Sequence, residues 1–156
     1  MANNSRPNLV GINHVALEVG NVEEALSFYG AIFDFELRGS HLDEAGRTTM
    51  AFIDMGDQFL ALSEGRKQGP DDARHFGLVV DDRSKVRELA ELAGARMVEG
   101  SFNFFDPWGN RVEVVEYRDV QFAKTDAVLN AMQISPDKSE RARAELREKG
   151  IGVAPT

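Results

Sequence analysis

The sequence contains no cysteine and only three histidines among its 156 residues. Without cysteine, neither a disulfide nor thiolate-bound zinc is possible, so any metal ion must be bound by nitrogen and oxygen atoms. No apolar run approaches the ~20 residues that span a bilayer, and residues 1–8 lack the apolar stretch of a signal peptide. We therefore expect a cytoplasmic protein that does not bind membranes.

Basic residues are also scarce relative to acidic ones, 18 against 26, which gives a net charge of −8. A nucleic-acid partner requires a basic surface that neutralises phosphates, so this charge argues against one. The 42% content of hydrophobic residues is sufficient for a packed core. These properties favour a protein that acts on small molecules.

Two stretches of the chain have the same order of predicted elements. The first has alternating strand residues at 10–19, a helix capped by Asn21, and strands at 36–40, 48–54 and 58–63 with a turn at Gly56-Asp57. The second has a strand at 74–80, a helix at 83–93 between Asp82 and Gly94, and strands at 95–99, 101–106 and 111–117. We predict an α+β fold of two βαβββ modules, residues 9–63 and 73–118, joined by a polar linker at 64–72.

Residues 119–156 differ in character and form a predicted helical extension. One short helix is expected within residues 124–132. A second is expected to begin at Ser135-Pro136, a cap followed by a proline, and to end at Gly150. Because its apolar positions are sparse, we expect it to pack on the outside or at a subunit interface.

The strongest internal repeat relates His14 to His75, 61 residues later, with Leu17 matching Leu78. The segment at 52–56 also echoes the segment at 104–109. Each histidine alternates with a small residue on its strand, Ala16 or Gly77, which leaves space for a ligand. Glu113 lies in the last strand of the second module. Two imidazoles and one carboxylate match a site with open positions for iron, manganese, nickel, cobalt or zinc.

Four segments resemble the vicinal oxygen chelate superfamily, which includes glyoxalase I, extradiol dioxygenases, fosfomycin-resistance thiol transferases and bleomycin-resistance proteins. They are residues 13–19, Phe28-Tyr29, residues 75–80, and residues 106–113 with an Asp-Pro-x-Gly-Asn turn. The resemblance covers roughly residues 9–118. It implies paired modules that form a U-shaped mixed sheet around a metal cavity, with His14, His75 and Glu113 as the ligands.

The sequence departs from each branch of this superfamily. Glyoxalase I has a fourth ligand, a glutamate on the last strand of its first module that also transfers protons. The corresponding strand of this chain, residues 58–62, contains no carboxylate. The extradiol and fosfomycin branches carry a tyrosine where this chain has Asn103, and the fosfomycin enzymes carry a threonine where it has Ala16. Glu18 is a candidate for the missing base, and Asn103 is a second candidate catalytic residue. Arg38 and His41 are interpreted as exposed loop residues.

Four hypotheses on function remain open. The favoured one is a divalent-metal-dependent, glyoxalase-like lyase or isomerase that acts on a small substrate with two adjacent oxygens. The first alternative is an extradiol-type dioxygenase. The second is a metal-free antibiotic-binding protein of the bleomycin-resistance type, and a related possibility is a regulatory relic with an empty site. A homodimer is expected, but the sequence leaves open whether one chain or two chains build the metal site.

Overall fold

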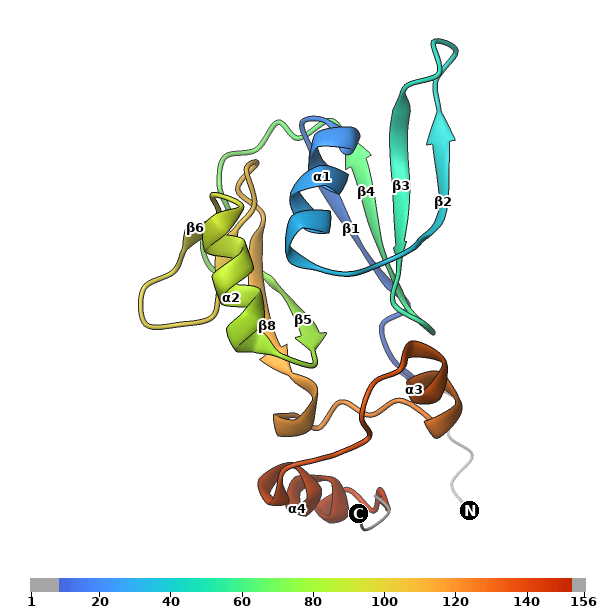
Figure 1. Ribbon diagram of the computed structural model, residues 1–156, viewed down its shortest axis with the longest axis vertical. Helices are drawn as coiled ribbons and strands as arrows, with labels where there is room; N and C mark the ends of the chain where they lie inside the picture. Colours follow the sequence, from blue (N-terminus) through green and yellow to red (C-terminus); the bar gives the residue numbers. More distant parts are fainter. Residues whose placement is uncertain (1–8, 153–156) are drawn as a thin grey trace.

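In the computed structural model, which describes residues 9–152, the chain forms two four-stranded sheets with matching strand orders (Figure 1). The first module consists of β1 (His14–Val19), α1 (Val22–Ile32), β2 (Leu37–Leu42), β3 (Thr48–Asp54) and β4 (Phe59–Glu64). The second consists of β5 (Phe76–Val80), α2 (Arg83–Leu92), β6 (Arg96–Met97), β7 (Phe104–Phe105) and β8 (Arg111–Glu116). The predicted α+β class and the βαβββ order of both modules are confirmed.

The strand orders are β1-β4-β3-β2 and β5-β8-β7-β6, so each sheet is mixed. Its first strand is parallel to its last strand, and the remaining pairs are antiparallel. A crossover helix joins the first strand to the rest of each sheet, as a parallel pair requires. Consequently β1 and β5 are equivalent edge strands. His14 is the first residue of β1, and His75 immediately precedes β5.

Both crossover helices begin where the sequence predicts. Asn21 caps α1 by accepting a hydrogen bond from the Glu24 amide, and Asp82 caps α2 by accepting one from the Lys85 amide. Each carboxamide or carboxylate satisfies a backbone donor that the first helical turn leaves unpaired. Gly94 follows α2 with a φ of +80°, the left-handed conformation typical of a glycine after a helix.

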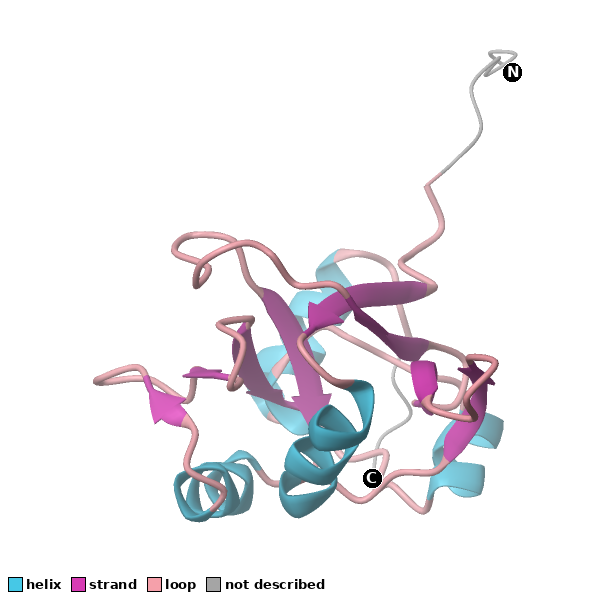
Figure 2. Ribbon diagram, turned by 90° about the horizontal axis from the view of Figure 1, so that it is seen from above, coloured by secondary structure: helices cyan, strands magenta, loops and turns pink. Residues whose placement is uncertain are grey.

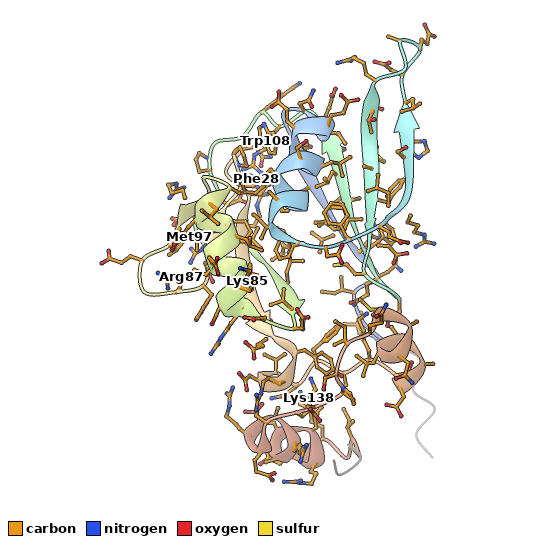
Figure 3. All side chains as sticks on the ribbon, viewed as in Figure 1. Phe28, Lys85, Arg87, Met97, Trp108 and Lys138 are labelled. Atoms are coloured by element: carbon orange, nitrogen blue, oxygen red, sulfur yellow. The ribbon has the colours of Figure 1, made fainter. Side chains whose placement is uncertain are left out.

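The helices cover one face of the sheets and join them into one core. Figure 1 shows α1 and α2 next to each other in front of the strands, and the two helices are in contact. Phe28 of α1 and Phe33, which follows the helix as its C-cap, pack against Phe104 of β7, with ring centroids 6.3 and 6.5 Å apart. Figure 3 labels Phe28 and Trp108 in the region where the two modules meet. The core therefore holds the two modules together through the helical layer, and the opposite faces of both sheets remain open.

The structure corrects the expected match between residues 52–56 and 104–109. Ile53 pairs with Leu60, and Phe104 pairs with Val112; all four side chains face the core. Ile53 is thus the equivalent of Phe104, one residue away from the match that the sequence indicated. The error arises because the two matched phenylalanines lie on opposite faces of their sheets: Phe52 is on the open face and Phe104 is in the core.

Several predicted boundaries also differ. The strands expected at 95–99 and 101–106 are shorter, because Gly100 has a φ of +71° and the Val98 amide donates to the Asn103 carbonyl, which closes a turn. Arg38 and His41, expected in a loop, belong to strand β2. Residues 1–8, on which the expectation about a signal peptide depends, lie outside the described part of the chain. Within residues 9–152 no helix is long and apolar enough to cross a membrane.

The C-terminal extension contains η1 (Tyr117–Asp119), α3 (Asp126–Met132) and α4 (Glu140–Glu148). Helix α4 begins at Glu140 with Ser139 as its cap, so the prediction of a start at Ser135-Pro136 is wrong. Ser135 instead accepts a hydrogen bond from the Asp137 amide, which forms a turn before the helix. Figure 1 shows α3 and α4 below both sheets, and in Figure 2, seen from above, fainter helices accordingly lie behind the strands.

Buried Lys138 fixes this extension. Its ammonium group donates hydrogen bonds to the carbonyl oxygens of Tyr117, Val120 and Phe122. Figure 3 shows Lys138 between α4 and the end of the second module. Lys124 makes a second attachment by donating to the Met55 carbonyl in the β3–β4 turn. Lys138 therefore holds the turns of the extension together, and Lys124 attaches the extension to the first module.

Candidate metal centre

The open faces of the two sheets carry the three predicted metal ligands. On β1, Leu17 and Val19 are buried in the core while His14, Ala16 and Glu18 are exposed. On β8, Val112 and Val114 are buried while Glu113 is half-exposed. The alternation confirms the predicted faces, because successive side chains of a strand point to opposite sides. All three ligand candidates are thus on surfaces that the helices do not cover.

His75 and Glu113 form a pair on the second sheet. The Nε2 atom of His75 lies 3.3 Å from Oε2 of Glu113, and both side chains are about two-fifths exposed, 41% and 43%. Nδ1 of His75 lies 2.8 Å from the Ala73 carbonyl oxygen. A carbonyl oxygen only accepts hydrogen bonds, so Nδ1 carries a proton and Nε2 is the ring nitrogen that faces Glu113. The neighbour of Glu113 across the strands is Gly77, which has no side chain to fill the space.

His14 has the same arrangement at the equivalent place on the first sheet. Its Nδ1 lies 2.9 Å from Oδ1 of Asn13, and among residues 9–152 Nε2 has no hydrogen-bond partner. The imidazole stacks on the Phe59 ring, with centroids 4.6 Å apart and planes 8° from parallel. Among residues 9–152, however, no three His, Asp or Glu side chains converge on one metal-sized space. One chain therefore brings together His75 and Glu113 but not His14.

The strand registers locate the other sequence candidates. Ala61 pairs with Ala16 as Glu113 pairs with Gly77, so Ala61 stands at the fourth-ligand position. Asn103 precedes β7, whose register, extended by one residue, places it opposite Glu113. Glu18 is exposed at the far end of β1 from His14. Asn103 therefore lies next to the His75–Glu113 pair, and the centre of the first sheet has no carboxylate.

A buried polar cluster next to the site was not predicted from the sequence. Asp106 is only 4% exposed and accepts hydrogen bonds from the Tyr29 hydroxyl, from the backbone amides of Trp108 and Asn110, and from the Asn110 side chain. Burial, together with the neighbouring Asp106 carboxylate, raises the pKa of Tyr29 well above its usual value. The Asn110 amide also donates to the carbonyl of Glu18. The Asp-Pro-Trp-Gly-Asn turn thus connects β8 to α1 and to the end of β1.

A cavity of about 410 Å³ lies between β1, the linker and the start of β5. Glu18 and His75 both line it, as do Arg66 and Arg74 from the linker region. Arg66 donates to Asn110 and Asp71, so its charge is directed into the polar cluster. The cavity brings the candidate base Glu18 into the neighbourhood of His75 of the same chain.

Comparison with known proteins supports the same assignment of the fold. The FosX fosfomycin resistance protein of Listeria monocytogenes aligns with a TM-score of 0.59 at 19% identity, covering 70% of this chain and 92% of that one. The FosX protein of Mesorhizobium loti gives 0.58 at 20% identity, covering 69% and 91%. An integron cassette protein of V. cholerae gives 0.52 at 21% identity, covering 72% and 98%. Structures of the Listeria protein include complexes with Mn(II).

The family model described as "Glyoxalase/Bleomycin resistance protein/Dioxygenase superfamily" matches residues 11–114. That range includes the first module from residue 11, the second module as far as the middle of β8, and all three ligand candidates, and it ends before the C-terminal extension. The chain belongs to the glyoxalase/bleomycin resistance protein/dioxygenase superfamily.

Proposed function

We propose that this protein is a divalent-metal-dependent enzyme that acts on a small substrate with two adjacent oxygen atoms. The observation that carries the proposal is the convergence of His75 Nε2 and Glu113 Oε2, 3.3 Å apart on an open sheet face. Two ligands that each lie about 2.1 Å from one ion are separated by roughly 2.9–3.4 Å. The pair thus has the spacing of two ligands of the same ion.

The hydrogen bonds of the histidines support this assignment. Metal-binding histidines commonly donate their second ring N–H to a carbonyl or carboxylate, which fixes the ring and the tautomer. In both His14 and His75 an oxygen acceptor lies next to Nδ1. Nε2 of His75 faces the Glu113 carboxylate, and Nε2 of His14 has no partner among the described residues. With nitrogen and oxygen donors only, the set suits iron, manganese, nickel, cobalt or zinc. The Mn(II) complexes of Listeria FosX agree with such a preference.

His14 of a second copy is the third ligand in this proposal. Within the described chain His14 has no carboxylate or histidine partner, yet it occupies the position equivalent to His75 in a matching module. A two-fold dimer that faces the first module of one chain with the second module of the other would form two identical sites. Each site would then combine His75 and Glu113 of one chain with His14 of its partner.

The proposed reaction is lyase or isomerase chemistry by proton transfer. When bound, the metal supplies a positive charge that stabilises developing negative charge on the substrate oxygens. Glu18 is the proposed base, because it is exposed on the open face and lines the same cavity as His75. Asn103, placed opposite Glu113 by the register, would hold a substrate oxygen by a hydrogen bond.

Extradiol-type oxygen chemistry is a second candidate, favoured by one observation. Ala61 replaces the fourth ligand, which leaves two histidines and one carboxylate. This set with open positions is the one used by non-haem iron oxygenases. Iron in the purified protein, with oxygen uptake on addition of a catechol, would support this candidate, whereas nickel, zinc or manganese would support proton transfer.

Metal analysis of the purified protein tests the proposal directly. We expect one divalent ion per chain in the wild type, loss of that ion in His75→Ala and Glu113→Gln, and an increased Tm on metal addition only in the wild type. Glu116→Gln is the matched control, since it removes another carboxylate of β8 that contacts Arg83 instead. The proposal fails if the wild type binds no divalent metal, or if His75→Ala retains it. Ligand binding without metal would then indicate a binding protein of the bleomycin-resistance type.

A further inference from the structure

The open face of the first sheet carries a cluster of rings around His14. Its members lie on the face of β2, β3 and β4 that points away from the helices. The Phe59 ring lies under His14, and the Phe52 ring meets Phe59 edge-on, with centroids 5.7 Å apart at 83°. His41 meets Phe52 in the same way, 5.6 Å apart at 81°. With Arg38, these residues are referred to below as the aromatic face.

Neither phenylalanine of the aromatic face is part of the core. Phe52 and Phe59 are only partly buried, and they are absent from the cluster of side chains that packs between the sheets and the helices. Grouped aromatic surface on an open face indicates a binding site more often than an isolated exposed ring does. The rings thus form a wall beside His14 that the fold itself does not require.

The second sheet has no cluster of partly exposed rings on this face: Phe105 lies there, but it is 7% exposed and covered by the guanidinium of Arg96. The register places Arg111 at the position of Phe59, and Asn103 at that of Phe52. Both residues are polar, and Arg111 donates to the Asp72 carbonyl. Since the modules are diverged copies of one unit, the partly exposed ring cluster beside the histidine distinguishes the first module from the second. A site built from both modules would have one polar wall with the carboxylate and one aromatic wall.

Arg38 adds a positive charge to the aromatic wall. Its guanidinium carbon lies 5.0 Å from the centroid of the Phe59 ring, and within residues 9–152 it forms no hydrogen bond or ion pair. The carboxylates Glu36, Asp54 and Glu18 lie on the same face, and none of them contacts Arg38 within the described residues. Asp54 accepts a hydrogen bond from the Gly56 amide in the neighbouring turn, and Glu18 is at the opposite end of β1 from Phe59. The exposed guanidinium is therefore available to an anionic ligand.

We propose that the aromatic face binds an aromatic carboxylate. The ring of the ligand would pack against Phe52 and Phe59, and its carboxylate would bind Arg38, with His41 at the rim. Aromatic pairs in such geometries are stabilised beyond their buried area, and an arginine pairs with a carboxylate through two parallel hydrogen bonds. The inference rests on the proposed function in one respect: the ring would place the two reacting oxygens of the substrate near His14.

Binding of three small probes to the full chain tests this inference. Benzoate has both the ring and the charge, cyclohexanecarboxylate has only the charge, and benzamide has only the ring. Measured by ligand-observed NMR in the presence of a chelator, benzoate should bind about 5–10-fold more tightly than either of the others. The chelator removes direct coordination of benzoate to a metal as an explanation.

Two variants and one control assign the binding to the aromatic face. Arg38→Gln should weaken benzoate about tenfold and leave benzamide unchanged, and Phe59→Leu should weaken benzoate more than cyclohexanecarboxylate. Arg87→Gln is the control, because Arg87 also stands over a phenylalanine ring, Phe102, but on the second module. Arg38→Gln, an exposed substitution, keeps the test valid even if Phe59→Leu unfolds the protein.

The outcomes separate this inference from the proposed function. Equal binding of benzoate and benzamide, or unchanged benzoate binding in Arg38→Gln, overturns the inference even if the metal analysis succeeds. Arg38-dependent benzoate binding in a protein that never binds metal supports the inference and refutes the proposed enzyme. If Arg38→Gln changes the oligomeric state instead of the benzoate affinity, the aromatic face is a dimer contact and the inference is wrong.

Discussion

Ala61 occupies in the first sheet the position that Glu113 occupies in the second. Ala61 pairs with Ala16 two residues after His14, and Glu113 pairs with Gly77 two residues after His75. The duplicated module therefore provides two histidines but only one carboxylate. This asymmetry is the main chemical difference between the proposed centre and a four-ligand site with a glutamate from each module.

Restoring the second carboxylate should strengthen metal binding. In Ala61→Glu the new side chain would add a negatively charged ligand on the same open face as His14, and an extra anionic oxygen favours a divalent cation. We expect the Kd for Ni²⁺ or Zn²⁺ to fall about tenfold, which corresponds to ~1.4 kcal/mol. Isothermal titration calorimetry measures it. Ala61→Gln, equal in size but uncharged, is the control; an equal gain in both variants would contradict a ligand role.

Mixing two inactive variants should restore metal sites if each site spans two chains. A heterodimer of His14→Ala and Glu113→Gln chains contains one site with both defects and one site with none. After random exchange of subunits half of the dimers are mixed, so about a quarter of the wild-type metal content should return. Each variant alone should bind none.

The same experiment distinguishes the alternative arrangement. If one chain supplied all three ligands, every site in the mixture would still carry one defect, and the metal content would stay at the level of the separate variants. Mixing His75→Ala with Glu113→Gln is the matched control. Both of these ligands come from the same chain, so no intact site can form in either arrangement. Recovery of metal in this control would show that a site carrying one of the two substitutions still binds the ion.

The local parts of this fold follow from the sequence, and the assembled site does not. Alternation along residues 14–19 is sufficient to place His14 on the open face, and Asn21 and Asp82 cap the helices as predicted. The aromatic face was missed because Phe52 and Phe59 meet only through the β3–β4 register, which spacing along one strand does not reveal. The distance between His14 and Glu113 depends on how modules pair, and hydrophobic patterns carry no information on that.

Replacement of Gly20 should disturb the junction between the modules. A Cβ atom at Gly20 would lie 2.4 Å from Nε1 of Trp108, and the rigid indole cannot yield without moving its turn. Gly20→Ala is expected to lower the free energy of unfolding by about 1–3 kcal/mol through overpacking. Trp108 is the only tryptophan, so its fluorescence should also shift to the red as the ring moves toward water. Gly30→Ala, where the nearest atom is 3.9 Å from the new Cβ, should leave the emission unchanged.

Titration of Lys138 should make the stability of the C-terminal extension depend on pH. Burial lowers the pKa of Lys138 to about 8 from an ordinary 10.5, although nearby Asp119 acts in the opposite direction. Between these two values the unfolded chain binds more protons than the folded chain, so the free energy of unfolding should rise with pH. Below pH 8 the lysine is protonated in both states, and its contribution should be constant.

The contribution of Lys138 is the difference in unfolding free energy between the wild type and Lys138→Met, measured by urea denaturation at pH 7, 8.5 and 10. This difference should change in favour of the wild type by at most about 1.4 kcal/mol per pH unit above pH 8. Lys149→Met, which removes an exposed lysine near the end of α4, corrects for the loss of one positive charge. A difference that falls with pH would mean that the carbonyls of Tyr117, Val120 and Phe122 hold the charged ammonium more strongly than burial opposes it.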